Sequence, residues 1–288
     1  LNVASDPLMS LNYVGVKGGC VLFVADDPGT ISSQTEQDTR RFASFAKVPV
    51  FDPADVEQGF AMMKAAFDLS ERYSTPVIVR PTTRVCHSST FLEVQNHTDA
   101  RPADGFVKDD SKWVIFPARA YRGHLEIQER LACIEEEFSG NSSSCSSEHE
   151  DLSLFNPAIE CGDAPRFGIV CGGVSTAYAL EALEFLSQRA ALPSYRFMQI
   201  GTPFPFPDKA ASAFLEGLER VIVFEELDHV IEDELVRLVG LHAMRGLSPT
   251  RVCGRRSGDA RAAGENSVED IFERLERFFT RAELEEEG

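Results

Sequence analysis

Short apolar runs alternate with longer amphipathic stretches over the first third of the chain. The runs cover Val21–Ala25, Val48–Phe51 and Pro76–Val79, and they contain many β-branched and aromatic residues. A stretch with helical spacing, Pro53–Tyr73, separates the second run from the third. Strands that alternate with helices are typical of βαβ units, so this pattern predicts a parallel sheet.

The predicted helix Pro53–Tyr73 carries an apolar stripe. Asp52 is the expected N-cap, because Asp is favoured at that position and Pro53 suits the first helical turn. A stripe at helical spacing normally faces the core, so we expect it to pack on the sheet. Its members are Phe60, Met63, Ala66, Phe67 and Leu69.

A second alternation of strands and helices begins near Ala164. The predicted strands are Arg166–Cys171, Tyr195–Ile200 and Val221–Phe224. Helices are predicted from the N-cap Ser175 to Arg189, after the capping residue Asp208, and from the acidic residues Glu225, Glu226 and Asp228 to Met244. Strand–helix alternation with short loops predicts a second small doubly wound domain.

Weaker patterns lie between and after these two regions. Gln95–Asp110 predicts a linker, Arg122–Phe138 a connecting helix, and the Ser-rich segment Gly140–Asp151 a disordered loop. Thr250–Asn266 is expected to be a loop and Val268–Leu284 an amphipathic helix. The fold class is therefore α/β, with two doubly wound domains and mostly parallel sheets. The predicted divisions are residues 1–94, 95–163, 164–250 and 251–288.

Composition narrows the classes of partner. The chain has 28 Lys and Arg against 46 Asp and Glu, a net charge of −18, which disfavours nucleic acid as a partner. No run approaches the roughly 20 apolar residues of a membrane helix, so no membrane association is expected. The seven cysteines include no CxxC pair. This indicates reduced thiols in a cytoplasmic protein and disfavours a local iron–sulfur or zinc site.

Polar loops follow two of the predicted strands of the first domain. Parallel sheets bind ligands beyond the carboxyl ends of their strands, so we expect the site in these loops. The candidate residues are Gly29, Ser32, Ser33, Gln34, Gln37, Arg84 and His87. Their hydroxyl and amide groups can form hydrogen bonds, and Arg84 can bind a carboxylate through two parallel bonds. Alternatively, Arg84 pairs with Asp26 or Asp27 and braces the strand ends.

Two further motifs have both a functional and a structural interpretation. Cys171–Ser175 reads CGGVS, a Gly-rich turn that could bind phosphate at a helix N-terminus or simply allow close packing. Close packing is favoured, because no Walker sequence or GxGxxG accompanies the turn. The acids of Glu225–His229 look like metal ligands, but acids are also stabilised by the dipole at a helix start. A structural role is the safer interpretation.

Several phrases resemble a known family when they are taken together. SDPLMSLNYVGVKGG, ADDPG, SSQTEQDTR, FAKVPVFDP and RPTTRVCHS are similar, in this order, to the pyrimidine-side domain of the α-subunit of indolepyruvate:ferredoxin oxidoreductase. The resemblance covers Leu1–Ser88 and resumes more weakly from about Arg166 to Leu241. There IVCGG, TPFPFP and RVIVFEE are similar to the transketolase C-terminal-type domain that follows it in this family.

The resemblance implies a thiamine-diphosphate-dependent enzyme. Such an enzyme converts an arylpyruvate and coenzyme A into arylacetyl-CoA and carbon dioxide, and it passes electrons to ferredoxin. It implies Mg and 4Fe–4S clusters in the intact complex, a β-subunit as partner, and an oligomeric assembly. Two alternatives stay open: a related oxidoreductase acting on pyruvate or 2-oxoglutarate, and a non-catalytic assembly or regulatory subunit on the same scaffold.

Parts that the resemblance leads us to expect do not match this sequence. The GDG…N motif that holds the diphosphate through Mg is only approached, by GDAP at Gly162 and GDARAAGEN at Gly258. In the family, the activating glutamate precedes the point where this chain starts, and Glu36 is not that residue. The cysteine-rich tail is also missing. We therefore expect a fragment with a truncated or processed start that is inactive alone and has no metal ligand or bound cofactor of its own. The sequence does not identify a catalytic residue.

Overall fold

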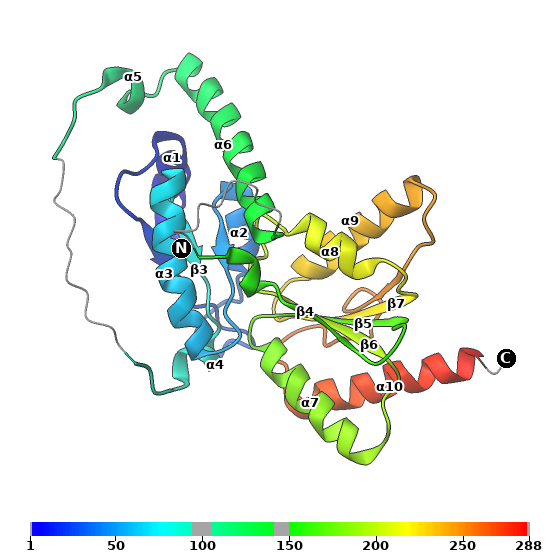
Figure 1. The fold of residues 1–288 in the computed structure, drawn as a ribbon. Helices are drawn as coiled ribbons and strands as arrows, with labels where there is room; N and C mark the ends of the chain where they lie inside the picture. Colours follow the sequence, from blue (N-terminus) through cyan, green and yellow to red (C-terminus); the bar gives the residue numbers. More distant parts are fainter. Residues whose placement is uncertain (1, 94–104, 141–149, 287–288) are drawn as a thin grey trace.

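The computed structural model describes residues 2–93, 105–140 and 150–286. Residues 95–104 of the predicted linker Gln95–Asp110 and residues 141–149 of the Ser-rich segment lie outside the described residues. Two α/β units lie side by side, and the long helix α6 (Pro117–Phe138) runs along the first of them (Figure 1). The predicted fold class is confirmed.

The first sheet is parallel and has the strand order β1-β3-β2. Its strands are β1 (Val21–Phe23), β2 (Val50–Phe51) and β3 (Val77–Val79). Val77 and Val79 pack on α3 (Val56–Tyr73) and α6 on one face, while Ile78 packs on α1 (Ser5–Val14) and α2 (Thr39–Ala46) on the other. The central strand is therefore buried on both faces, as its unbroken apolar run predicts.

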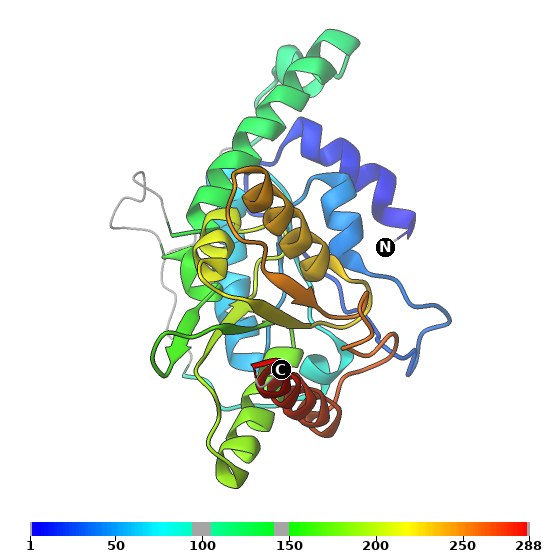
Figure 2. The same cartoon turned by 90° about the vertical axis from the view of Figure 1, so that its right-hand side faces the viewer.

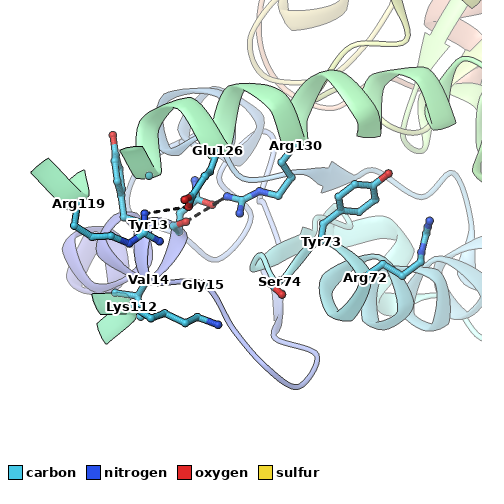
Figure 3. A pocket seen from close by; sticks show the side chains of 12 residues that line it. Tyr13, Val14, Gly15, Arg72, Tyr73, Ser74, Lys112, Arg119, Glu126 and Arg130 are labelled. Carbon is cyan, nitrogen blue, oxygen red and sulfur yellow. Dashed lines mark hydrogen bonds and ion pairs between the residues drawn. The ribbon is translucent and has the colours of Figure 1, made fainter. Parts of the chain in front are cut away.

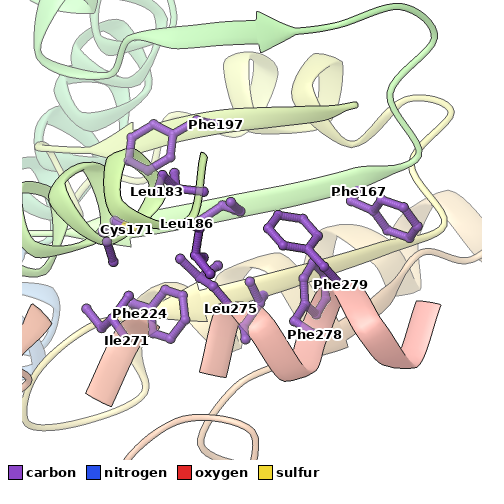
Figure 4. Packing of buried hydrophobic residues seen from close by; sticks show 14 of the residues in the cluster. Phe167, Cys171, Leu183, Leu186, Phe197, Phe224, Ile271, Leu275, Phe278 and Phe279 are labelled. Atoms are coloured by element: carbon purple, nitrogen blue, oxygen red, sulfur yellow. The ribbon is translucent and has the colours of Figure 1, made fainter. Parts of the chain in front are cut away.

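The second sheet has the order β4-β6-β5-β7-β8, and all its pairings are parallel except that of β4 with β6. One face packs on α7 (Ser175–Arg189) and α10 (Val268–Glu286) around Phe167, Leu275 and Phe278 (Figure 4). The other packs on α8 (Asp208–Leu215) and α9 (Val230–Met244). Figure 2 shows α9 and α10 on opposite sides of the sheet. The strands are β4 (Ala158–Cys161), β5 (Phe167–Gly172), β6 (Tyr195–Ile200), β7 (Arg220–Phe224) and β8 (Arg251–Cys253).

Short helices complete the described structure. They are η1 (Asn2–Ala4), α4 (Thr83–His87), α5 (Asp110–Trp113) and η2 (Leu152–Phe155). No helix in the described part of the chain is long and apolar enough to cross a membrane.

The predictions for α3 were wrong in two respects. The helix begins at Val56, and its cap is Asp55, whose side chain accepts a hydrogen bond from the Gln58 N–H, rather than Asp52. Phe60 and Phe67, which were expected to face the sheet, are 51% and 44% exposed. Ala66 and Leu69 are buried as predicted, but the buried stripe is completed by Met62 and Ala65, one step round the helix from the two aromatic residues. Phe60 instead shares a shallow apolar pocket with Phe23 of the edge strand β1, where no further described strand covers it.

Two strands lie where the pattern indicated none. β8 lies in the predicted loop Thr250–Asn266, and β4 lies in the segment 95–163. Both are short edge strands, so they lack the long apolar run of a central strand. Smaller differences concern helix starts: α6 begins at Pro117 rather than Arg122, and Ser175 and Asp208 are first helical residues rather than caps.

Candidate functional site

The carboxyl end of the first sheet lies against the carboxyl end of the second. The Val50 N–H donates to the Phe204 carbonyl, and the Asp52 N–H donates to the Gly201 carbonyl, both at 2.8 Å. Val50 begins the two-residue strand β2 and Asp52 directly follows it, while Gly201 and Phe204 follow β6. The edges at which parallel sheets place ligands therefore meet in one junction.

Arg80 joins the strand ends of the first sheet. It follows β3 directly, and its guanidinium lies 2.6 Å from Asp26 after β1 and 3.2 Å from Asp52 after β2. Asp26 also accepts hydrogen bonds from the backbone and side chain of Thr39 at the start of α2. Arg80, Asp26 and Asp52 are buried, and a buried charge is tolerated only when it is paired.

Arg40 joins the two sheets. Its buried guanidinium lies 2.8 Å from the Glu225 carboxylate and 2.7 Å from Asp38, and it donates to the carbonyls of Glu226 (2.6 Å) and Asp228 (2.9 Å). The Glu225 carboxylate also accepts the first backbone N–H groups of α9 at 2.9–3.0 Å. A residue of the first sheet unit is thereby connected to a helix start in the second.

The junction contains more carboxylates than guanidinium groups. Burial raises the pKa values of Asp52 and Glu225, and it raises that of Glu226 to about 7. Asp38 differs: burial acts on it most strongly, but the charge and hydrogen bond of Arg40, with the charge of Arg80 and the Asp228 N–H, together outweigh burial and lower its pKa. The buried acids at the junction are Asp26, Asp38, Asp52, Glu225 and Glu226.

Polar atoms without a hydrogen-bond partner also gather at this junction. Thr82 and Arg80 follow β3, whereas Thr176 and Glu226 come from the second unit. In the second unit, Asn266 connects the start of α7 to the loop after β7. Its N–H donates to Glu226 and its side chain donates to Ser175, both at 2.9 Å. Buried atoms of this kind normally hold water or a bound polar group. The unpartnered atoms are Arg80 Nη2, Thr82 Oγ1, Thr176 Oγ1 and Glu226 Oε2.

The loop after β1 is held by Asp27. Its carboxylate accepts the backbone N–H groups of Ser32 and Ser33 at 2.7 Å and the Thr83 hydroxyl at 2.8 Å. The Ser32 N–H, followed by the other donors, keeps the pKa of Asp27 below its usual range. Within the same loop the Gly29 N–H donates to the Glu36 side chain. The four polar candidates Ser32, Ser33, Gln34 and Gln37 are all exposed.

The two candidate loops meet at Glu265. Arg84 forms two hydrogen bonds with the Glu265 carboxylate, at 2.6 and 2.8 Å, and the Cβ position of Gly29 would lie 3.6 Å from the Glu265 N atom. The alternative that Arg84 pairs with Asp26 or Asp27 is wrong, because those acids already bind Arg80, Thr39 and the loop after β1. His87 ends α4 and is exposed.

The Gly-rich turn after β5 packs closely against the first unit. Gly173 has φ +52°, and a Cβ there would lie 2.8 Å from Asp52 Oδ1. This agrees with the packing interpretation of CGGVS. The acids before α9 likewise satisfy the helix start and Arg40. In the described ranges, no group of three His, Cys, Asp or Glu side chains could hold a metal ion.

A cation-lined pocket lies at the opposite, amino end of the first sheet (Figure 3). Arg119 pairs with Glu126 at 3.0 Å, and Arg130 donates to the side chain and carbonyl of Asn12 near the end of α1. α1 and α3 both end at this pocket, with their negative dipole ends toward it. Arg72 pairs with Glu137, so most of the cations that line the pocket already bind groups of the chain itself, and the pocket is a poor anion site.

Sequence reasoning missed the buried centre of the junction. Asp52, Arg80 and Glu225 each directly follow an apolar run. A charged residue in the first position after a predicted strand could therefore have indicated these three members of the junction. Arg40 has no such signal, because it lies inside a helix between Thr39 and Arg41.

Comparisons with known proteins extend the resemblance stated above. No family model matches the chain. The chain is 37% identical over 240 residues to indolepyruvate oxidoreductase subunit IorA of Pyrococcus horikoshii, covering 82% of this chain and 34% of the relative. The chain is a homologue of subunit IorA. The IorA of Methanothermobacter thermautotrophicus is 35% identical over 241 residues, covering 83% of this chain and 36% of that one. The chain thus spans about a third of the length of the IorA relatives it matches.

Solved structures share the fold at low sequence identity. The chain is similar to a 2-oxoglutarate:ferredoxin oxidoreductase from Magnetococcus marinus, with a TM-score of 0.58 and 15% identity over 96% of this chain and 51% of that chain. It is also similar to a split-gene transketolase, with a TM-score of 0.50 and 13% identity over 96% of this chain and 73% of that chain. The expectation of a transketolase C-terminal-like domain agrees with these matches.

Proposed function

We propose that this chain is part of a thiamine-diphosphate-dependent 2-oxoacid:ferredoxin oxidoreductase of the indolepyruvate type. In the intact complex, with a β-subunit, it would take part in converting an arylpyruvate and coenzyme A into arylacetyl-CoA, with ferredoxin as electron acceptor. Support comes from the IorA relatives and from the fold of the 2-oxoglutarate:ferredoxin oxidoreductase. The chain's own contribution would be one wall of the 2-oxoacid site.

The observation that carries this assignment is the fixed position of the loops at the junction. Arg80 holds the three strand ends of the first sheet, and Asp27 holds the loop after β1. A wall with preset geometry saves the ordering entropy that binding would otherwise cost. In this role the exposed groups of Ser32, Ser33 and the two glutamines would hydrogen-bond the 2-oxoacid. Arg84 would bind its carboxylate only by leaving Glu265.

The described residues do not fit the metal–diphosphate end of the cofactor or an iron–sulfur cluster. No three potential ligands converge in the described ranges, and the described cysteines lie on separate elements. We therefore assign to this chain no step that runs through Mg or a cluster, and we place those groups elsewhere in the complex.

The test is the intact enzyme, purified with its second subunit. Reduction of a viologen dye is measured with coenzyme A and, in turn, indolepyruvate, phenylpyruvate, pyruvate and 2-oxoglutarate. We expect the arylpyruvates to give the highest kcat/KM and the 288-residue chain alone to give no turnover. The variant Gln34→Ala should raise the KM for the 2-oxoacid, whereas Gln188→Ala, exposed on α7, should not.

The outcomes separate the alternatives. Preference for pyruvate or 2-oxoglutarate would show that arylpyruvates are not the substrate class, while the proposed enzyme family would stand. A complex that assembles with the second subunit yet reduces no dye with any substrate would identify an assembly or regulatory subunit. Equal KM values for Gln34→Ala and Gln188→Ala would show that the loop after β1 does not contact the 2-oxoacid.

A further inference from the structure

The second sheet has a topological switch point between β5 and β7. The chain leaves β5 toward β6 on one side and returns to β7 on the other, since the strand order is β6-β5-β7. The loops after β5 and β7 therefore diverge and leave a crevice at their carboxyl ends. Open α/β sheets bind their ligands in this crevice.

Here the crevice is filled by the first sheet unit. The Arg40 side chain is fully buried, and its Nη1 lies 3.8 Å from the Cβ position of Gly172 at the end of β5. On the β7 side it contacts the Glu225 carboxylate and the carbonyls of Glu226 and Asp228. The guanidinium thus stands where a ligand of such a sheet would bind.

We propose that this crevice is a guanidinium-binding site and that Arg40 occupies it in cis, so that the second unit is a receptor for the first. The site consists of the Glu225 carboxylate, the two carbonyls of the loop after β7, and Asp38, which the first unit supplies. This assignment is independent of the oxidoreductase proposal, because it rests on the contacts of Arg40 alone.

The contacts select a guanidinium group rather than any cation. All three nitrogens of Arg40 donate: Nε and Nη2 to Asp38, Nη1 to Glu225, and Nη2 also to the carbonyls. Acceptors for all three nitrogens suit the rigid fork of Arg but not the point charge of an ammonium group. Both carboxylates are buried, so an empty crevice would leave unpaired charge.

Chemical rescue tests the proposal in the full chain. Arg40→Ala empties the crevice and should lower the Tm by about 10 °C. Guanidinium or methylguanidinium chloride at about 20 mM, far below denaturing concentrations, should restore at least about 3 °C of that loss. Sodium chloride and methylammonium chloride at the same concentration should restore none.

Arg41→Ala is the matched control. Arg41 is adjacent, also forms ion pairs with the second unit, and is 41% exposed. Arg41→Ala should therefore lower the Tm only slightly, and guanidinium should not raise the Tm of this variant. The proposal is wrong if guanidinium fails to raise the Tm of Arg40→Ala, or raises the Tm values of Arg41→Ala and the wild type equally. If Arg40→Ala does not accumulate as folded protein, its yield on refolding from urea decides instead: methylguanidinium should increase the yield, and methylammonium should not.

Discussion

The guanidinium of Arg80 lies 2.6 Å from the carboxylate of Asp26 and ties the end of β3 to the end of β1. Arg80→Met should therefore leave Asp26 and Asp52 as buried charges without their main partner. We expect the free energy of unfolding, measured by urea titration, to fall by about 3–5 kcal/mol. Arg84→Ala, which removes an exposed ion pair, should hardly change the midpoint. Equal losses in the two variants would contradict the assignment of Arg80 as the brace of the strand ends.

Glu226 should make stability depend on pH. Burial raises its pKa in the folded protein to about 7, from the value of 4.5 that is usual for a glutamate side chain in water. The folded state thus binds the proton more tightly than the unfolded state. Proton binding by Glu226 therefore stabilises the folded state. This stabilisation is complete below about pH 4.5 and is lost as the pH rises through 7, which lowers the free energy of unfolding by roughly 3 kcal/mol.

The variant Glu226→Gln removes this titration. Its free energy of unfolding should fall less than that of the wild type between about pH 5 and pH 8. The control is Glu219→Gln, because Glu219 is exposed on the surface and its pKa is lowered by the hydrogen bond from Arg166. If the wild type and Glu226→Gln show parallel pH profiles, Glu226 is ionised over the whole range.

The aromatic face of α3 contributes little to the stability of this chain. Phe60 is half exposed, so Phe60→Ser should change the free energy of unfolding by about 0.5 kcal/mol or less. Met62 is fully buried one step round the helix, and Met62→Ala should cost about 2–5 kcal/mol. Urea titration of both variants gives the comparison. If Phe60→Ser lowers the free energy of unfolding more than Met62→Ala does, Phe60 packs in the core as the sequence analysis predicted.

Gly173 has no space for a side chain. Gly173→Ala places a methyl group 2.8 Å from Asp52 and also a non-glycine residue at φ +52°. Gly217 is the control, because it has φ +76° but no heavy atom within 4 Å of its Cβ position. Both alanines share the backbone penalty, so the difference between their unfolding free energies isolates the close contact. We expect Gly173→Ala to be less stable by about 1–3 kcal/mol.

Local signals predicted the main elements well. Tyr195–Ile200 was predicted to the residue, and α3, α7, α9 and α10 were placed within a few residues, because apolar periodicity reports directly on burial. The short edge strands β4 and β8 were missed, since three or four partly exposed residues carry little periodicity.

The junction could not be predicted in the same way. Arg40 and Glu225 are 185 positions apart, and no spacing rule connects them. The choice between Arg80 and Arg84 as the brace depends on which side chain is buried, and RPTTR offers both at a strand end. The exposed aromatic residues of α3 were misplaced because helical spacing identifies an apolar face but not the surface that covers it.

The backbone bond between Val50 and Phe204 has a mechanical consequence. Together with the bond from Asp52 to Gly201, it extends hydrogen bonding across the boundary between the sheets, so neither sheet can rotate away without breaking main-chain bonds. Hinged opening at this seam is therefore costly. Any movement that admits a ligand must be local. Asp27 holds the backbone of the loop after β1, so the exposed side chains of that loop and of Arg84 are the groups best able to move.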